Sequence, residues 1–396
     1  MSSVNFLEKL LDGVEVEWKT LGQTCKIETG KLNANAAVDD GEYMFFTTAK
    51  ETSKIDKFRW DTEALLIAGN ANVGEVKHYI GKFEAYQRTY VLTNFDENVS
   101  VRFLYFVLSH SLKKYLEERT NSAAMTYIVL STLENFPIPI PSPDNPEKSL
   151  AIQSEIVRIL DKFTALTAEL TAELNMRKKQ YNYYRDQLLS FDESSVEWKT
   201  LLEACDYVDY RGKTPKKTQS GIFLVTAKNI RMGYIDYHAS QEFISEEDYA
   251  IVMRRGLPKK GDVLITTEAP CGFVAQVNRE NIALAQRVIK YRSKNTQLSN
   301  SFLKHYLLGS QFQDKLMQAA TGSTVKGIKG SRLHQLKIPI PSKVEQDRIV
   351  AILDKFDTLT NSITEGLPRE IELRQKQYEY YRDLLFSFPK PETVSN

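Results

Sequence analysis

The longest regular pattern of apolar positions runs through residues 146–192, and it predicts a helix. Apolar side chains recur there at alternating steps of four and three residues, which is the spacing of a coiled-coil seam. Residues 344–396 show the same pattern. The predicted seam consists of Ile152, Ile156, Ile159, Phe163, Leu166 and Leu170 in the first stretch and of Ile349, Ile352, Phe356, Leu359 and Ile363 in the second.

Two arrangements of these helices are compatible with the pattern: each helix packs on its own domain, or the two pack on each other. About 40 residues make a rod of roughly 60 Å, which is too long for one small domain to cover. We therefore favour paired helices. A chain that leaves one domain along the first helix must return along the second, so we expect an antiparallel coiled coil.

The remaining stretches carry short β-rich runs, glycine-rich turns and one helical segment each, near residues 101–119 and 301–319. This pattern predicts an α+β fold in which two similar α/β domains are separated by the two long helices, with pseudo-twofold symmetry. The chain begins like the tail of a helical unit, so we expect the C-terminal helix to dock beside its start. The predicted segments are 1–13 (completing the helical repeat), 14–145 (first domain), 146–192 (central helical spacer), 193–343 (second domain) and 344–396 (C-terminal helical spacer and tail).

Four short motifs occur twice, at an offset close to half the chain. They are Trp-Lys-Thr-Leu (18–21 and 198–201), Ile-Pro-Ile-Pro-Ser (138–142 and 338–342), Ile-Leu-Asp-Lys-Phe (159–163 and 352–356) and Tyr-Tyr-Arg-Asp (183–186 and 380–383). A solenoid would repeat every 20–50 residues, so these motifs indicate one large unit used twice. We expect the tryptophans and the cysteines that follow them, Cys25 and Cys205, to be structural.

The central stretch also contains a perfect tandem of four residues. The repeat consists of Thr167, Ala168, Glu169 and Leu170, followed by Thr171, Ala172, Glu173 and Leu174. It is either a helix-forming surface segment or a ruler, because four residues add about 6 Å of helix. The second stretch has no plain counterpart and carries Gly366 and Pro368, so we expect a kink or break there.

Composition adds few constraints on function. The 396 residues are 42% hydrophobic, with 52 basic and 51 acidic side chains, so any nucleic-acid binding must come from a local patch. Three cysteines without a C-x-x-C pair argue against a zinc site. The start lacks the features of a signal peptide, and no apolar run is long enough for a membrane span. We expect a cytoplasmic protein.

No catalytic or metal-binding constellation is recognisable. Gly212-Lys213-Thr214 looks like the end of a phosphate-binding loop, but Tyr207 stands where that loop needs its first glycine. The five histidines have no metal-ligand spacing, and the Asn-Pro-Pro-Tyr or Asp-Pro-Pro-Tyr motif of an amino-methyltransferase is absent. The sequence therefore predicts a protein that is not an enzyme.

Basic side chains gather in three parts of the second domain, and one run, between Asp314 and Glu345, contains no acid. Each cluster alone could be a solvated face, but three together favour DNA binding, in which lysine anchors phosphates and arginine or asparagine reads bases. The candidates there are Arg211, Lys213, Lys216, Lys217, Lys228, Asn229, Arg231, Lys326, Lys329 and Arg332. The first domain has fewer cations and more acids, and its candidates are Lys50, Arg59, Asn70, Asn72, Lys77, Arg88 and Tyr127.

The repeated domain, helix and motifs resemble the specificity subunit of type I restriction–modification enzymes over nearly the whole chain, and the tandem resembles the spacer repeat of one subgroup. The resemblance implies that residues 14–145 and 193–343 are target-recognition domains, each reading half of a split double-stranded DNA sequence. It also implies that the helices bind two methyltransferase subunits and that restriction subunits join the complex. It implies no cofactor on this chain, with S-adenosylmethionine in the methyltransferase partner and ATP and Mg in the restriction partner.

Two rival functions stay open. A pure scaffold would bind partner proteins through the coiled coil without sequence-selective DNA binding. An enzyme acting on nucleic acid is disfavoured, because the sequence offers no catalytic group. An adjacent methyltransferase gene would favour the recognition subunit over both.

Overall fold

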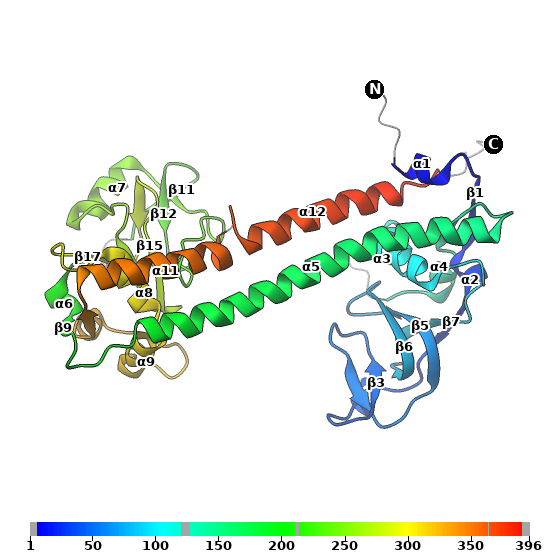
Figure 1. The fold of residues 1–396 in the computed structure, drawn as a ribbon, viewed down its shortest axis with the longest axis horizontal. Coiled ribbons are helices and arrows are strands. Elements are labelled where there is room, and N and C mark those ends of the chain that lie inside the picture. Colours follow the sequence, from blue (N-terminus) through cyan, green and yellow to red (C-terminus); the bar gives the residue numbers. More distant parts are fainter. Residues whose placement is uncertain (1–5, 120–126, 211–213, 363, 390–396) are drawn as a thin grey trace. The chain divides into compact units, whose positions relative to one another are not determined.

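The computed structural model describes residues 6–119, 127–210, 214–362 and 364–389 (Figure 1). The chain divides into two compact units, one made of residues 1–168 and 372–396 and the other of residues 169–371. Each unit contains one globular domain and parts of the long helices. The boundary at Ala168 falls inside the tandem Thr-Ala-Glu-Leu repeat.

The first domain is built on a six-stranded sheet in the order β2-β7-β5-β6-β3-β4. Its strands are β2 (Lys26–Thr29), β3 (Tyr43–Phe46), β4 (Ser53–Ile55), β5 (Trp60–Ala68), β6 (Val76–Ala85) and β7 (Thr89–Thr93). Neighbours are antiparallel except for β3 and β6. Alternation along β5 gives the sheet two faces. Leu65 and Ile67 pack with helix α3 (Val101–Arg119), whereas Ala64 and Leu66 pack with Phe46 and other residues of the opposite face.

The second domain has the same strand order with one additional strand, β11, but it is divided between two four-stranded sheets, β10-β17-β14-β15 and β11-β13-β12-β16. The strands are β10 (Cys205–Asp209), β11 (Lys217–Thr218), β12 (Ile222–Val225), β13 (Phe243–Ile244), β14 (Val263–Thr267), β15 (Cys271–Gln276), β16 (Ile282–Leu284) and β17 (Val288–Ser293). In the first domain the ten residues of β6 pair with both β5 and β3. Here residues 277–281 interrupt the equivalent strand, so β15 pairs with β14 and β16 with β12.

The helix of the second domain is also divided. The sequence predicted one helix near 301–319, but the structure has α8 (Asn300–Leu308) and α9 (Ser310–Ala319). Gly309 between them has an extended backbone, and the Ser310 amide donates to the Asp186 carboxylate at 3.2 Å. An amide that bonds outside the helix cannot continue the intrahelical ladder, which explains the break.

The two repeated motifs that flank each domain pair with each other. Strand β1 (Val16–Thr20) runs antiparallel to β8 (Pro137–Pro141), and β9 (Glu197–Thr200) runs antiparallel to β18 (Lys337–Ile340). Prolines fit such two-stranded ribbons because an edge strand can spare its N–H groups. A capping box then starts a short helix, α2 (Leu21–Thr24) or α6 (Leu201–Ala204).

The remaining short elements lie at the domain surfaces and at the chain start. They are α1 (Phe6–Leu11), α4 (Leu130–Glu134), α7 (Glu246–Val252) and α10 (Gly330–Leu333), with 3-10 turns at Ala34–Ala36 and Met253–Arg255.

The first long helix, α5 (Pro146–Leu188), is continuous over 43 residues and carries the tandem repeat. The second is interrupted: α11 (Lys343–Asn361) ends before Gly366, which has a φ of +82°, and α12 (Leu367–Leu385) begins beside Pro368. A left-handed glycine and a proline in the first turn are usual at such boundaries, so the predicted break is confirmed.

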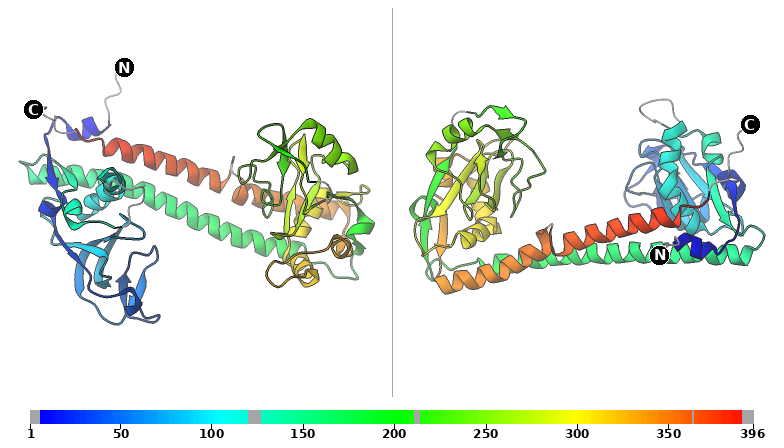
Figure 2. Two further views of the ribbon diagram at one scale, coloured as in Figure 1. Left: turned by 180° about the vertical axis from the view of Figure 1, so that it is seen from behind. Right: turned by 90° about the horizontal axis from the view of Figure 1, so that it is seen from above.

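In each unit the start of one long helix lies beside the end of the other (Figure 2). In the first unit the Phe163 ring stacks on Tyr381 of α12, with centroids 5.4 Å apart. In the second unit Phe356 of α11 stacks on Tyr184 of α5 at 5.9 Å and on Tyr181 at 6.0 Å. The repeated phenylalanine and tyrosine motifs therefore contact each other in both units.

Part of the predicted seam belongs to the domain cores. Ile152 and Ile156 are buried in one cluster with the residues of α3, and Ile349 is buried in a cluster with those of α8. The first alternative, a helix packed on its own domain, thus applies at the start of each helix. Further along, the predicted seam residues are half-buried, and they are Ile159, Phe163, Leu166, Leu170, Ile352, Phe356 and Leu359. Ile363 lies outside the described residues.

The C-terminal segment docks on the first domain as predicted. Leu385 and Phe388 lie in its hydrophobic cluster, together with Leu7 of α1. The Trp18 indole N–H donates to the Pro389 carbonyl at 2.9 Å. In the second domain Phe191, which follows α5, contacts Phe302, with ring centroids 6.2 Å apart. The equivalent contact in the first domain joins Phe388 to Phe103, with ring centroids 6.3 Å apart.

A buried glutamine fixes each long helix to its domain. Gln153 and Gln346 are fully buried, and each accepts a 2.8 Å hydrogen bond from a backbone amide, that of Ser100 or Ser299. Each also donates to a loop carbonyl, Gln153 to Asn98 at 2.9 Å and Gln346 to Gln297 at 2.7 Å. Buried polar groups with satisfied partners specify one orientation of the helix on the domain.

Candidate nucleic-acid interface

The basic segments near Arg255 and near Gly330 both approach the end of strand β10. The Tyr210 hydroxyl donates to the Gly256 carbonyl at 2.6 Å, and the Arg255 guanidinium donates to the Asp209 carbonyl at 3.0 Å. A side chain at Gly330 would lie 3.4 Å from the Asp209 carboxylate. Residues 209–210, 255–256 and 330 therefore belong to one region of the domain.

A short closed loop presents part of this region. The backbones of Thr321 and Gly327 exchange two hydrogen bonds, of 2.8 and 2.9 Å, so residues 322–326 project between them. All five are exposed, including Val325 and Lys326, and Gly322 has a φ of +112°. The loop offers a cation and free backbone amides to an anionic ligand.

Beside this loop lies a polar pocket of about 430 Å³. It is lined by Thr267, Glu268, Gln286, Arg287, Thr321, Val325, Gly327, Ile328 and Lys329. The Gln286 amide donates to the Thr214 hydroxyl at 3.1 Å, which connects the pocket to the segment at 214–217. The Arg287 guanidinium lies 3.4 Å from the Glu268 carboxylate, and both side chains are about half exposed.

Most candidates in the second domain are exposed, although several already have partners. Lys217 pairs with Glu242 at 3.0 Å, Arg231 lies 3.7 Å from Asp236, and Arg332 donates to the Ala319 carbonyl at 3.2 Å. The exposed lysines are Lys216, Lys217, Lys228, Lys326 and Lys329. Arg211 and Lys213 lie outside the described residues.

Asn229 is not available to read a base, so its place among the candidates was wrong. Its side chain is fully buried. Its carboxamide oxygen accepts from the Thr226 amide and hydroxyl, both at 2.9 Å, and its nitrogen donates to the carbonyls of Asp236 and Ser240 at 3.0 and 2.8 Å. All its hydrogen-bonding capacity is used to hold the turn after β12.

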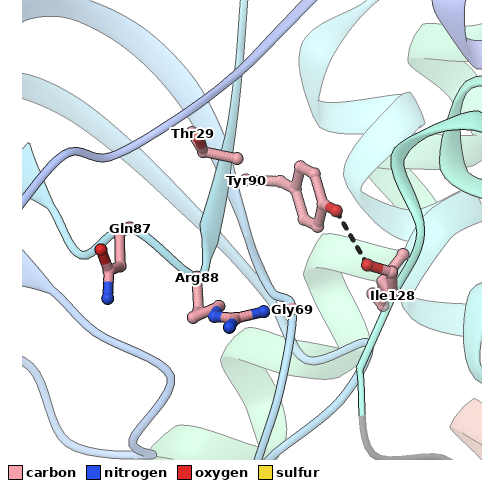
Figure 3. Close-up of a pocket in the computed structure, with 6 residues that line it drawn as sticks. All are labelled: Thr29, Gly69, Gln87, Arg88, Tyr90 and Ile128. Atoms are coloured by element: carbon pink, nitrogen blue, oxygen red, sulfur yellow. Dashed lines mark hydrogen bonds between the residues drawn. The ribbon is translucent and has the colours of Figure 1, made fainter.

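The first domain has a pocket of about 310 Å³, lined by Thr29, Gly69, Gln87, Arg88, Tyr90 and Ile128 (Figure 3). The Tyr90 ring is directed at Ile128, and its hydroxyl donates to the Ile128 carbonyl at 2.9 Å. Burial raises the pKa of Tyr90, so the hydroxyl stays protonated and keeps this bond. The Arg88 side chain is exposed and extends beside Gly69.

Several first-domain candidates stabilise the domain itself. The Lys77 ammonium donates to the carbonyls of Ala49 and Lys50 at 2.8 and 2.7 Å, and the Asn72 amide donates to the Thr48 carbonyl at 2.7 Å. Arg59 lies over the Trp60 ring at 4.4 Å and contacts Glu28 at 3.4 Å.

The other first-domain candidates, Lys50, Asn70, Arg88 and Tyr127, lie at or near the surface. Lys50 and Tyr127 are exposed, and Asn70 forms a backbone bridge with Tyr127 at the pocket edge. The equivalent bridge in the second domain joins Glu268 to Gly327, so Tyr127 corresponds to Gly327.

Reading the sequence missed Gln87, Gln286 and Arg287. The signal was present, since the dipeptide Gln-Arg stands just before β7 and again just before β17. Arg88 was among the candidates, but its glutamine and the matching dipeptide of the second domain were not. Both dipeptides line the pocket of their domain.

The described residues of this region offer hydrogen-bond donors and cations. Within the described ranges no cluster of histidine, cysteine and acidic side chains could hold a metal ion. Burial raises the pKa of both Cys25 and Cys205 to about 12, so neither thiol is a nucleophile. The part of the chain that the structure describes also contains no helix long and apolar enough to cross a membrane.

Comparison with known proteins assigns the repeat. The family model of the type I restriction modification DNA specificity domain matches residues 13–177 and again residues 198–373. The EcoR124I/EcoR124II specificity subunit of Escherichia coli is 44% identical, and the match covers 100% of both chains. The EcoprrI specificity subunit of Escherichia coli is 35% identical over 92% of this chain and 93% of the relative.

Solved structures agree on the fold. The crystal structure of a type I restriction–modification S subunit from M. genitalium matches with a TM-score of 0.58 and 18% identity, covering 96% of this chain and 98% of that one. Because the family model covers both halves and the relatives match from end to end, this chain belongs to the family of type I restriction–modification specificity subunits.

Proposed function

We propose that this chain is the non-catalytic DNA-recognition subunit of a type I restriction–modification complex. Each domain reads one half of a split target in double-stranded DNA. The observation that carries the proposal is the match of one DNA specificity domain model to both halves of the chain. The exposed donors around each pocket are of the types that contact phosphates and base edges.

The long helices bind two methyltransferase subunits, and restriction subunits join through that complex. This part of the proposal is supported by exposed aromatic side chains on helix surfaces. Tyr183 of α5 and Tyr380 of α12 are 62% and 65% exposed, and they occupy equivalent positions in the repeated Tyr-Tyr-Arg-Asp motif. Exposed tyrosines are enriched at protein interfaces.

Chemistry in the complex belongs to the partners. The methyltransferase binds S-adenosylmethionine, the restriction subunit binds ATP and Mg, and this chain binds neither. The complex acts on DNA in the cytoplasm. A pure scaffold would bind the same partners without selecting a DNA sequence.

The test is a map of N6-methyladenine in a methylation-free host that expresses the chain with its neighbouring methyltransferase. A single split motif with a fixed gap is expected. An assembled complex that binds S-adenosylmethionine and methylates no defined motif would contradict the recognition role and support the scaffold.

The tandem Thr-Ala-Glu-Leu repeat sets the length of the gap between the half-sites, as in the subgroup that the sequence resembles. The repeat lies within the continuous helix α5, so one more copy adds about 6 Å of helix. One base pair adds about 3.4 Å. Inserting a third copy should therefore lengthen the gap in the methylated motif by one or two base pairs and leave both half-sites unchanged. A matched control inserts four residues in the exposed loop at 192–195, where the gap should stay constant.

A further inference from the structure

The pockets of the two domains occupy the same place in the fold. In the first domain the Gly69 amide donates to the Arg88 carbonyl at 2.8 Å, and the Ile128 amide donates to the Gly69 carbonyl at 2.8 Å. In the second domain the Thr267 amide donates to the Arg287 carbonyl at 2.8 Å, and the Ile328 amide donates to the Thr267 carbonyl at 2.9 Å. The same three strands and loops therefore frame both pockets.

The side chains that line these equivalent frames fall into two groups. Three positions are identical: the glutamine and arginine before β7 or β17, and the isoleucine after the loop. The other positions differ. Gly69 corresponds to Thr267, and at the bridge beside it Asn70 corresponds to Glu268.

The difference between the groups has a physical reading. Two domains that read unlike half-sites share one feature of the ligand, the sugar–phosphate backbone, because its charge and geometry are the same at every sequence. The polar residues retained in both pockets, glutamine and arginine, are suited to that shared feature. Residues that differ, such as Asn70 and Glu268, are suited to base edges, where an amide and a carboxylate have different preferences.

The charge of the retained residues agrees with this assignment. Arg88 is exposed, and within the described residues no carboxylate forms an ion pair with it. Arg287 pairs with Glu268, but both side chains are about half exposed, so the pair is weak and can open. A guanidinium and a carboxamide from adjacent residues that line one pocket offer several donors to phosphate oxygens.

We propose that Gln87 and Arg88, and equally Gln286 and Arg287, form a duplicated phosphate-binding site that anchors each domain to DNA without selecting its sequence. This inference rests on the proposed DNA-recognition function. In this proposal, the retained glutamine and arginine contribute affinity for DNA and fix the position of the domain along it. The neighbouring positions that differ between the domains distinguish one base sequence from another.

The test uses the full chain in complex with its methyltransferase partner. Affinity is measured at several salt concentrations for a duplex carrying the mapped target and for one with both half-sites scrambled. Each phosphate contact contributes about 0.9 to the slope of log K against log salt. Arg88→Ala and Arg287→Ala should each reduce the magnitude of that slope by about 0.9, the double variant by about 1.8, and affinity for both duplexes should fall by the same factor.

Two controls make the result specific. Arg88→Lys keeps the charge and should keep the slope. Arg279→Ala removes an exposed arginine that lies over the Tyr237 ring at 3.7 Å, outside the pocket, and it should leave the slope unchanged. Arg88 and Arg287 are exposed, so the alanine variants should melt like the unmodified complex.

Two results would overturn the inference while leaving the proposed function intact. In both, the unmodified complex prefers its target. In the first result, the alanine variants retain the full salt slope. In the second, the alanine variants lose selectivity at one base pair, so that the methylated motif becomes degenerate there. The second result would make the arginines base readers. Failure of the unmodified complex to prefer its target would overturn both the inference and the function.

Discussion

In the first domain, the turn that follows β3, at residues 47–50, is stabilised from outside. The side chains of Lys77 and Asn72 donate hydrogen bonds to its backbone carbonyls. In the second domain the equivalent turn after β12, at residues 226–229, is held from within by Asn229. The exposed lysine of the turn is the same in both, Lys50 and Lys228. The two domains therefore keep a backbone frame and one surface cation while the side chains that stabilise them differ.

The pockets of the two domains likewise share a backbone frame and differ in side chains. Their backbone bonds are the same within 0.1 Å, yet the pocket of the second domain is lined by a carboxylate and a lysine, Glu268 and Lys329, whereas that of the first is lined by Thr29 and Tyr90. A frame set by backbone hydrogen bonds tolerates substitution of the side chains around it. This is how one fold can serve two different half-sites.

The largest expected effect concerns the helix contact that the two units share. Phe163→Asp and Phe356→Asp each remove an aromatic stack and place a carboxylate among tyrosines, at an expected cost of about 3 kcal/mol. Both should lower the thermal midpoint and abolish capture of the methyltransferase partner. The leucine variants at both positions are the controls and should cost less than about 1.5 kcal/mol. Normal assembly by either aspartate variant would show that the two contacts are not equivalent.

The side chains that stabilise the two equivalent turns, Asn229 in the second domain and Asn72 with Lys77 in the first, should contribute differently to the free energy of unfolding. Asn229→Ala leaves the amide and hydroxyl of Thr226 and two loop carbonyls without their partner, so we expect a loss of about 3 kcal/mol. Asn72→Ala removes one hydrogen bond while Lys77 still holds the turn, so about 1 kcal/mol is expected. Urea unfolding of the two variants measures the difference. Equal losses would contradict the larger contribution assigned to Asn229.

The repeated architecture was predictable because its signals are local. The heptads, the Pro-rich strands, the helix at Val101–Arg119 and the break at Gly366 and Pro368 follow from apolar spacing and backbone chemistry. The pairing of β1 with β8 follows from nothing local, since it joins segments more than a hundred residues apart. The same applies to Gln153 and Gln346, whose partners lie in distant loops.

The candidate interface was predictable in part. Lysines in a glycine-rich, acid-free run gave the exposed loop at Lys326 and the pocket residue Lys329. Composition cannot distinguish a buried amide from an exposed one, which is why Asn229 was assigned to DNA. Arg287 was missed because its correspondence to Arg88 shows only in the shared backbone frame, where the Gly69 amide bonds the Arg88 carbonyl and the Thr267 amide bonds the Arg287 carbonyl.

A third prediction concerns the loop beside the pocket of the second domain. Lys326→Glu together with Lys329→Glu should weaken DNA binding and reduce the magnitude of the salt slope by about 1.8, leaving partner assembly intact. The control Lys355→Glu with Lys376→Glu changes the net charge equally on α11 and α12 and should keep the slope. An equal loss of DNA binding in the control would show that total charge, and not the loop, carries the effect.

The smallest expected effect is on the pH dependence of stability. The aspartate of the repeated Leu-Asp-Lys-Phe motif has different partners in the two units, so the two units should respond differently to acid. The Arg102 guanidinium donates to one carboxylate oxygen of Asp161 through two nitrogens, at 2.6 and 3.1 Å. Asp354 instead accepts from the buried His305 ring at 2.7 Å and from Lys304 at 3.5 Å. Burial lowers the pKa of His305, and the hydrogen bond to His305 lowers the pKa of Asp354.

Both shifts have the same sign for stability. The unfolded chain takes up protons more readily than the folded one, so stability is lost as pH falls below about 6.5 for the histidine and below about 3.9 for the aspartate. His305→Gln should therefore flatten the fall in thermal midpoint between pH 7 and pH 5. Arg102→Gln should lower the midpoint by a similar amount across that range, because arginine stays charged. Burial also lowers the pKa of His110 in the first unit, so the midpoint of the His305 variant will still fall to some extent. An unchanged pH dependence in that variant would show that His305 is not the group that makes the second unit sensitive to acid.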